Sequence, residues 1–317
     1  MRIQFGLAAL GALVAGCVAA APGARATYPG EPGLIAYSSS AGYRDGSEAI
    51  WARSPFGGPA HKLTPHADSA IDPSARFVSD YDPSWSPTGD RFVFTRETEL
   101  GMRVYIARAD GRGSHALVAA DALGSDSSRQ PDFGPNGRVA FVRLTGPGDP
   151  AKEVIWSARA DGTGLRRLAE GSSPVWSPNG HRVVFDGPDG DLSVMRADGS
   201  GQHVLGGPCR RAGLVDFAPG GHRFAAVYSR SGSPDQHVYT MGLGCRHRKQ
   251  VTRPGGGAAF DPVWSPDARW VAYFRFGSHH QGKPPHPSGI YLSRPDGSGE
   301  RRVQGPGGFP LAWQPRP

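Results

Sequence analysis

A seven-residue unit built around one aromatic residue recurs along the chain and constrains its fold more than any other feature. In its clearest copies the unit is Pro-x-Trp-Ser-Pro-x-Gly, and the aromatic residues of successive copies are 48, 43, 41, 47 and 49 positions apart. These aromatic residues are Trp85, Phe133, Trp176, Phe217, Trp264 and Trp313. Such a period is typical of propellers and solenoids, in which each unit buries a face against the next one.

A second element follows the first with the same period. It has the sequence Arg-Ala-Asp-Gly at 108–111, 159–162 and 196–199, and Arg-Pro-Asp-Gly at 294–297. Asp-Gly between apolar segments predicts a β-hairpin, and Ser-Pro-x-Gly predicts a tight turn because Pro fixes φ and Gly adopts positive φ. We therefore expect four antiparallel strands in each unit, which is one blade of a β-propeller.

The composition agrees with this interpretation. Gly and Pro number 46 and 30 among 317 residues, about 24 % together. Long helices tolerate neither residue in their interiors, so helical bundles and doubly wound α/β sheets are excluded. The periodic placement of these residues favours a turn-rich β fold over a disordered chain.

The two ends of the repeat region predict how the ring closes. Residues 34–37, 48–53 and 61–64 resemble strands two, three and four of a blade that lacks its first strand, and residues 309–314 resemble a first strand that lacks its blade. The sequence thus predicts an all-β fold over residues 33–317. It is a six-bladed β-propeller of four-stranded antiparallel blades, in which the C-terminal strand completes the N-terminal blade.

The Pro-x-Trp-Ser-Pro-x-Gly unit with its downstream Asp-Gly hairpin resembles the repeat of the TolB-like propeller family, over nearly all of residues 33–317. The resemblance implies an exported bacterial propeller that binds a protein or peptide partner in the cell envelope. TolB itself also has an N-terminal α/β domain, for which the few residues between Ala26 and the first strand leave no room. The resemblance therefore implies general partner binding and not the specific Tol–Pal role.

The first 26 residues have the features of an export signal. Met1-Arg2 gives a positive start, an apolar run covers residues 3–21, and Ala24-Arg25-Ala26 fits the small-x-small cleavage pattern. We expect a signal peptide over residues 1–26 and a short linker over 27–32. The protein is then secreted or periplasmic.

A competing cleavage site lies inside the same run. Residues 14–17, Val-Ala-Gly-Cys, resemble a bacterial lipobox, in which cleavage after Gly16 exposes Cys17 for lipidation. Such a lipid would be the chain's only link to a membrane. Simple secretion and a cell-envelope lipoprotein both remain open.

Charge and motifs limit the function classes. The formal net charge is +7, spread along the chain without any block of five like charges, so nucleic-acid binding is not expected. No G-x-S-x-G, P-loop, H-E-x-x-H or C-x-x-C motif occurs. We expect a monomeric, non-catalytic binding protein without a cofactor. The alternative is a propeller-type hydrolase or lyase acting on an extracellular polysaccharide.

Polar residues just before the aromatic anchors are the candidate binding residues. They are predicted to lie at the mouth of the central channel, on the face that carries the loops between strands four and one and between strands two and three. They are Asp82, Gln130, Asp132, Ser173, Asp216 and Asp261. Carboxylates in this ring could hold a cation or a basic peptide. The plainer interpretation, which we favour, is that Asp before Pro caps the turn into the inner strand.

Histidines in one long loop give a weaker candidate site. His279, His280 and His286 lie within residues 277–287 and could bind a transition metal. A solvated loop is the simpler interpretation.

Cys209 and Cys245 are candidates for a disulfide, because an exported protein meets oxidising conditions. The blade pattern argues against the bond, since it places the two residues on opposite faces, separated by a strand about 17 Å long. A bond would gather neighbouring basic residues into a patch able to bind an anionic envelope polymer. The sequence alone does not decide between the bonded and the free cysteines.

Overall fold

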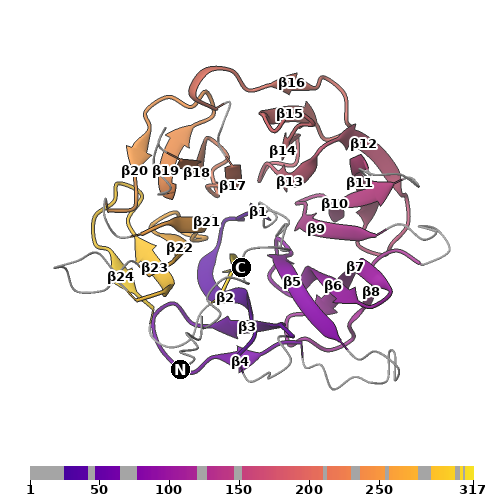
Figure 1. The fold of residues 1–317 in the computed structure, drawn as a ribbon, viewed down its shortest axis with the longest axis horizontal. Helices are drawn as coiled ribbons and strands as arrows, with labels where there is room; N and C mark the ends of the chain where they lie inside the picture. The colour runs from indigo at the N-terminus through magenta and orange to yellow at the C-terminus, as the bar shows by residue number, and fades with distance from the viewer. Residues whose placement is uncertain are drawn as a thin grey trace, which may run out of the picture.

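The computed structural model describes residues 25–41, 47–64, 77–119, 127–145, 152–209, 213–229, 236–253, 257–277, 287–303, 308–309 and 311–317. Six sheets surround a central axis, as Figure 1 shows. Apart from one 3-10 turn, η1 (Gly207–Cys209), the regular elements of the described residues are β-strands. None of the described residues forms a helix long and apolar enough to cross a membrane.

The first three blades each run from an inner strand at the axis to an outer strand at the rim. Blade one is β25 (Leu311–Arg316), β2 (Glu31–Ser39), β3 (Ala49–Arg53) and β4 (His61–Lys62). Blade two is β5 (Val78–Trp85), β6 (Arg91–Thr98), β7 (Gly101–Arg108) and β8 (His115–Ala116). Blade three is β9 (Ser128–Phe133), β10 (Arg138–Thr145), β11 (Lys152–Arg159) and β12 (Arg166–Glu170).

The remaining blades follow the same order. Blade four is β13 (Ser172–Trp176), β14 (Arg182–Asp186), β15 (Leu192–Arg196) and β16 (His203–Val204). Blade five is β17 (Gly213–Phe217), β18 (Arg223–Ser229), β19 (Gln236–Gly242) and β20 (Lys249–Gln250), with the two-residue β1 (Arg25–Ala26) added to its inner edge. Blade six is β21 (Ala259–Trp264), β22 (Val271–Arg275), β23 (Gly289–Ser293) and β24 (Arg301–Arg302).

The ring closes as the sequence predicts. β25 pairs antiparallel with β2, so that Trp313 lies opposite Ile35 and Ala312 opposite Ala36. The C-terminal strand is thus the inner strand of the N-terminal blade. The prediction of six four-stranded antiparallel blades is confirmed.

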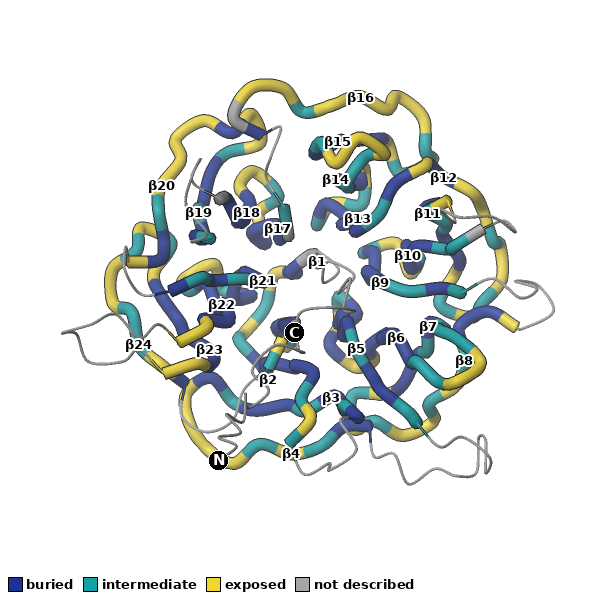
Figure 2. Tube along the Cα trace, in the orientation of Figure 1, coloured by how far each residue is buried: buried dark blue, intermediate teal, exposed yellow. Residues whose placement is uncertain are grey.

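The aromatic anchors lie in the core between blades. Five inner strands end at their aromatic residue, and all six anchors are at most 4 % exposed. Trp85 packs in one apolar cluster with Ala36 and Ile50 of blade one, and Trp264 packs in another with Val227 of blade five. Each of these anchors therefore fills the seam with the preceding blade. Figure 2 shows the resulting gradient, with buried backbone near the axis and exposed backbone along the rim.

The glycine of the Asp-Gly hairpin has a role beyond the turn. Gly111 and Gly162 have φ of +82° and +81°, which L side chains rarely adopt. A Cβ on Gly111 would lie 1.8 Å from the carbonyl oxygen of Leu63, and one on Gly162 would lie 2.2 Å from that of Leu117. Both carbonyls belong to the preceding blade. The hairpin glycine therefore lets neighbouring blades approach closely.

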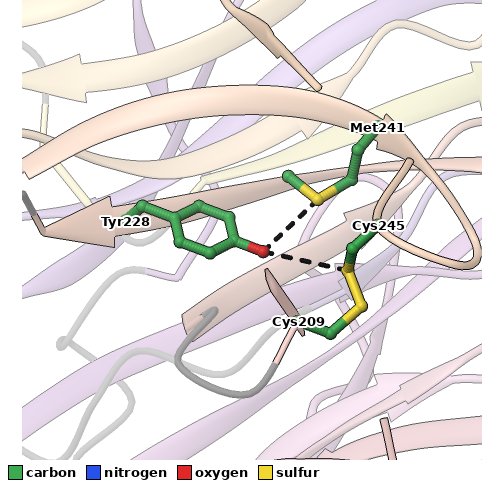
Figure 3. The surroundings of a disulfide bond; sticks show 4 residues. All are labelled: Cys209, Tyr228, Met241 and Cys245. Carbon is green, nitrogen blue, oxygen red and sulfur yellow. Dashed lines mark hydrogen bonds between the residues drawn. A yellow bond between two sulfur atoms is a disulfide. The ribbon is translucent and has the colours of Figure 1, made fainter. Parts of the chain in front are cut away.

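Two features add to what the sequence indicates. Thr27 and Tyr28, in the segment predicted as a linker, are buried and contact the inner strands of blades five and three. Cys209 and Cys245 are joined in a disulfide, with Cα atoms 5.5 Å apart (Figure 3). The separation of about 17 Å expected between the two cysteines assumed outer strands of about five residues. The outer strands β16 and β20 have only two residues each, so they do not hold the cysteines apart.

The disulfide lies in the apolar seam between blades four and five. Both cysteines belong to an apolar cluster that contains Trp176 of blade four and Phe217 of blade five. The Tyr228 hydroxyl donates to Met241 Sδ at 3.3 Å and to Cys245 Sγ at 3.8 Å, as the dashed lines of Figure 3 show. The bond is therefore part of the core between two blades.

Replacing Gly111 by Ala should destabilise the fold more than the same change at Gly113. Gly113 belongs to the same hairpin and has φ of +67°, but its Cβ would meet open space. We expect a loss of about 1 kcal/mol for Gly113→Ala from backbone strain, and about 2–4 kcal/mol for Gly111→Ala, where a clash with Leu63 adds to it. Urea unfolding of both variants measures the difference. Equal losses would show that the inter-blade approach does not matter.

Candidate functional site

The inner strands share a bulge just before their aromatic anchors. In blades two to six the register with the second strand shifts at this point. Four residues there have positive φ although they are not glycine, at 53°, 53°, 51° and 48°: Asp82, Gln130, Ser173 and Asp261. Each precedes a proline. Left-handed backbone in such residues is strained and persists only where the surrounding structure fixes it.

Three of these residues take part in hydrogen bonds that link consecutive blades. Asp82 Oδ2 accepts from the Thr95 hydroxyl at 3.2 Å, and Thr95 Oγ1 accepts from the backbone N–H of Gln130 at 3.1 Å. Gln130 Oε1 accepts from the backbone N–H of Ser173 at 3.2 Å. Asp82, Gln130 and Ser173 are all buried. The structure thus brings them together as a chain across blades two, three and four.

Asp132 and Asp216 connect neighbouring blades in a second way. Asp132 accepts from the Ser84 hydroxyl at 3.0 Å and from the Trp176 backbone N–H at 2.7 Å. Asp216 accepts from the Trp264 backbone N–H at 2.6 Å. Each of these two carboxylates directly precedes one aromatic anchor and accepts a hydrogen bond from the backbone N–H of the anchor in the next blade. These carboxylates therefore bind the following blade.

An extended N-terminal segment occupies the centre of the ring. β1 runs parallel to β17, with Arg25 opposite Asp216, and lies at the axis in Figure 1. The Thr27 hydroxyl donates to Asp216 Oδ2 at 3.0 Å, and the Tyr28 hydroxyl donates to the Phe133 carbonyl oxygen. Burial raises the pKa of Tyr28 well above its usual value, and the charges of nearby Asp132 and Asp216 raise it further. The channel thus accepts an extended chain through backbone pairing and hydroxyl contacts.

A cluster of phenylalanine rings lies beside the channel and was not predicted from the sequence. Phe260, Phe274, Phe276 and Phe309 form a continuous set of ring contacts, with centroids 5.1–5.6 Å apart. Phe276 is 43 % exposed and Phe309 37 %. The cluster lies on the mouth face across the seam between blades six and one. The sequence feature that could have pointed to the cluster is Phe260, because it directly precedes the candidate binding residue Asp261.

Negative charge is crowded at the mouth ends of two blades. Burial, followed by the charge of Asp82, raises the pKa of Glu48 to about 6. Burial is also the main cause that raises the pKa of Asp186 to about 6; the Ser173 hydroxyl opposes the shift and the charge of Glu153 adds to it. Both raised values thus reflect water-poor surroundings first and a nearby carboxylate second.

The remaining predicted sites lie outside the described residues. They are Cys17, His279, His280 and His286. Within the part of the chain that the structure describes, no three His, Cys, Asp or Glu side chains are placed to hold a metal ion.

Comparison with known proteins establishes the fold. The sequence matches no protein-family model, and no curated protein has a significantly similar sequence. TolB from Acinetobacter baumannii superposes with a TM-score of 0.64 at 14 % identity, over 90 % of this chain and 67 % of that one. A chain of the nidogen/laminin complex superposes with a TM-score of 0.60 at 12 % identity, over 89 % of this chain and 98 % of that one. Oligogalacturonate lyase in complex with manganese superposes with a TM-score of 0.56 at 13 % identity, over 88 % of this chain and 77 % of that one. The predicted TolB-like propeller fold is confirmed.

Asp186 should make the fold less stable as the pH rises. The folded carboxyl keeps its proton up to a pH of about 6, whereas the unfolded one loses it near the usual value of 3.8. Between these values the folded state binds more protons, so the free energy of unfolding falls as the pH rises from about 4 to 6 and then levels off. We expect Asp186→Asn to match the wild type near pH 4 and to be about 2 kcal/mol more stable at pH 7.

Urea unfolding at the two pH values measures this difference. Asp189→Asn, at an exposed carboxylate of the same loop, is the matched control and should change stability by less than about 0.5 kcal/mol at either pH. A pH-independent difference between Asp186→Asn and the wild type would contradict the assignment.

Proposed function

We propose that the protein is an exported, monomeric binding protein whose mouth face holds an extended, basic segment of a partner protein in the cell envelope. The observation that carries this proposal is the exposed aromatic pair Phe276 and Phe309, which the rings of Phe260 and Phe274 support from below. Clustered, partly exposed aromatic side chains on a rigid frame are the usual anchors of protein interfaces.

The chain's own N-terminal segment supports an extended ligand. Residues 25–28 lie along the inner edge of β17 through parallel strand pairing and two hydroxyl contacts, those of Thr27 and Tyr28. Inner strands of a propeller have a free edge toward the axis, and an added strand is a common mode of peptide recognition. A partner segment would enter the ring by the same type of contact.

The charge of the mouth supports a basic segment. Glu48 and Asp186 lie at mouth-side strand ends, and each has a raised pKa because it is buried near another carboxylate. A Lys or Arg side chain placed between such groups would relieve their mutual repulsion.

Export is supported by the signal-like residues 1–26 and by the disulfide. A bond between Cys209 and Cys245 suits an oxidising compartment. Cleavage after Ala26 would remove β1 and leave the inner edge of β17 open to a partner segment, whereas lipidation of Cys17 would keep β1 in the chain.

Photocrosslinking tests the proposed mouth interface. A photoreactive phenylalanine analogue at position 276, in protein expressed in its native cells, should give an adduct of defined mass. The same analogue at position 56 should give none, because Phe56 is 56 % exposed but lies on the opposite face. Phe309→Ala should lower the yield from position 276 at least about 10-fold, which is the effect of losing one interface anchor. Equal adducts from both positions, or none from position 276, would contradict the proposal.

The alternative of a polysaccharide lyase or hydrolase has one supporting observation, which is the similarity in fold to the manganese-bound oligogalacturonate lyase. Metal analysis of protein purified without chelators separates the two functions. One equivalent of manganese that is lost in the His279→Ala/His280→Ala/His286→Ala variant would favour the lyase. We expect less than about 0.1 equivalent, because histidines kept apart by prolines form a poor ligand set.

A further inference from the structure

A basic pocket lies on the face opposite the mouth, in the seam between blades five and six. This hairpin face carries the turns between strands one and two and the hairpins between strands three and four. The pocket has a volume of about 430 Å³. Its charged lining residues come from both blades: Arg223, Lys249, Arg269, Arg294 and Asp296. Such a volume is within the range of small-molecule sites.

Aromatic rings and hydrogen bonds hold two of the guanidinium groups in place. The Arg223 guanidinium lies over the Trp264 ring at 5.3 Å from its centroid, and the Arg294 guanidinium lies over Trp270 at 4.2 Å. Arg223 also donates to the Thr240 hydroxyl at 3.0 Å, and that hydroxyl donates to the Pro295 carbonyl oxygen at 2.8 Å. Thr240 therefore links blade five to the hairpin of blade six, and the cations are positioned before any ligand arrives.

The pocket's own carboxylate is bound mainly within its hairpin, and the charge of Lys249 acts on it more weakly. Asp296 accepts from the backbone N–H and the hydroxyl of Ser298, at 2.9 and 2.8 Å, and these bonds hold it within the hairpin. Among the described residues, no carboxylate lies within 4.0 Å of the charged nitrogens of Arg223, Lys249 or Arg294. Arg269 has the Asp267 carboxylate at 4.0 Å from its Nε, so three of the pocket's four cations have no carboxylate of the described residues within 4.0 Å.

The equivalent position of blade three shows that this arrangement is local. Arg138 begins β10 as Arg223 begins β18, and Ser157 lies on the neighbouring strand where blade five has Thr240. In blade three the Arg138 guanidinium donates to the Gly164 carbonyl oxygen at 2.7 Å and to the Ser157 hydroxyl at 2.9 Å. The Arg138 donors therefore bind within blade three, whereas the Arg223 guanidinium of blade five lines the pocket.

We propose that this pocket is a binding site for an anion with two linked phosphate groups. Guanidinium groups bind phosphate oxygens through paired N–H donors, and Lys249 adds a point charge. One phosphate group carries about −1.5 to −2 at pH 7, so two linked groups match three unpaired cations better than one does. A soluble diphosphate and the headgroup of a diphosphate lipid share this chemistry.

Isothermal titration calorimetry with inorganic pyrophosphate tests the site in the whole protein. We expect pyrophosphate to bind at least about 10-fold more tightly than inorganic phosphate, with an affinity that falls as salt is added. Arg223→Gln and Arg294→Gln should each weaken pyrophosphate binding about 10-fold or more. Arg182→Gln, at an exposed arginine of blade four on the same face, is the matched control and should leave the affinity unchanged.

Further measurements keep folding and binding apart. Arg223→Lys retains the charge but not the paired donors, so it should also weaken binding while the melting temperature stays constant. Pyrophosphate should change the fluorescence of wild-type protein more than that of Trp270→Phe, in which Trp264 still lies against Arg223. Vesicles that contain a diphosphate lipid compete with pyrophosphate if the natural ligand is lipid-borne, and their failure to compete indicates a soluble one. Equal affinities for phosphate and pyrophosphate, or unchanged binding by both glutamine variants, would overturn the proposal.

Discussion

The antiparallel pairing of β25 with β2 closes the ring, and the packing of every blade between two neighbours depends on that closure. A single blade cannot bury both of its faces, so the apolar clusters draw side chains from two or three neighbouring blades. The approach of Gly111 to Leu63 and the bond from the Trp176 N–H to Asp132 are both contacts between blades. Each of these contacts needs only its own two blades, and closure gives every blade such a neighbour on both sides, so that no blade is left with an apolar face exposed.

The buried polar groups near the axis connect neighbouring blades and also determine the charge of the candidate site. Asp132 and Asp216 hydrogen-bond to the inner strand of the next blade. The bulge residues Asp82, Gln130 and Ser173 form a hydrogen-bonded chain that includes Thr95. Because these groups are held in a water-poor interior, their charges act strongly on neighbours such as Tyr28. The frame therefore supplies the electrostatic character of the mouth, while the side chains of the connecting segments supply the exposed surface.

The features that the sequence predicts well are those that recur in every blade. Trp85 and four of its counterparts end their inner strands, while Trp313 lies within β25, and all six are buried. Features that occur once were missed or could not be decided. The burial of Thr27 and Tyr28 depends on a central channel that no local pattern contains. The Cys209–Cys245 bond depends on two-residue outer strands. The phenylalanine cluster joins segments around Phe260, Phe276 and Phe309 that meet only in the closed ring.

The two proposed binding faces lie at opposite ends of the same strands, so the length of a strand separates their charges. β14 begins at Arg182 on the hairpin face and ends at Asp186 on the mouth face. A strand of this length spans about 17 Å, which exceeds the Debye length of about 8 Å at physiological ionic strength. Basic groups at one end therefore do little to neutralise acidic groups at the other. One rigid ring can present an acidic, aromatic surface to a protein segment and a basic pocket to a phosphate ligand without either site weakening the other.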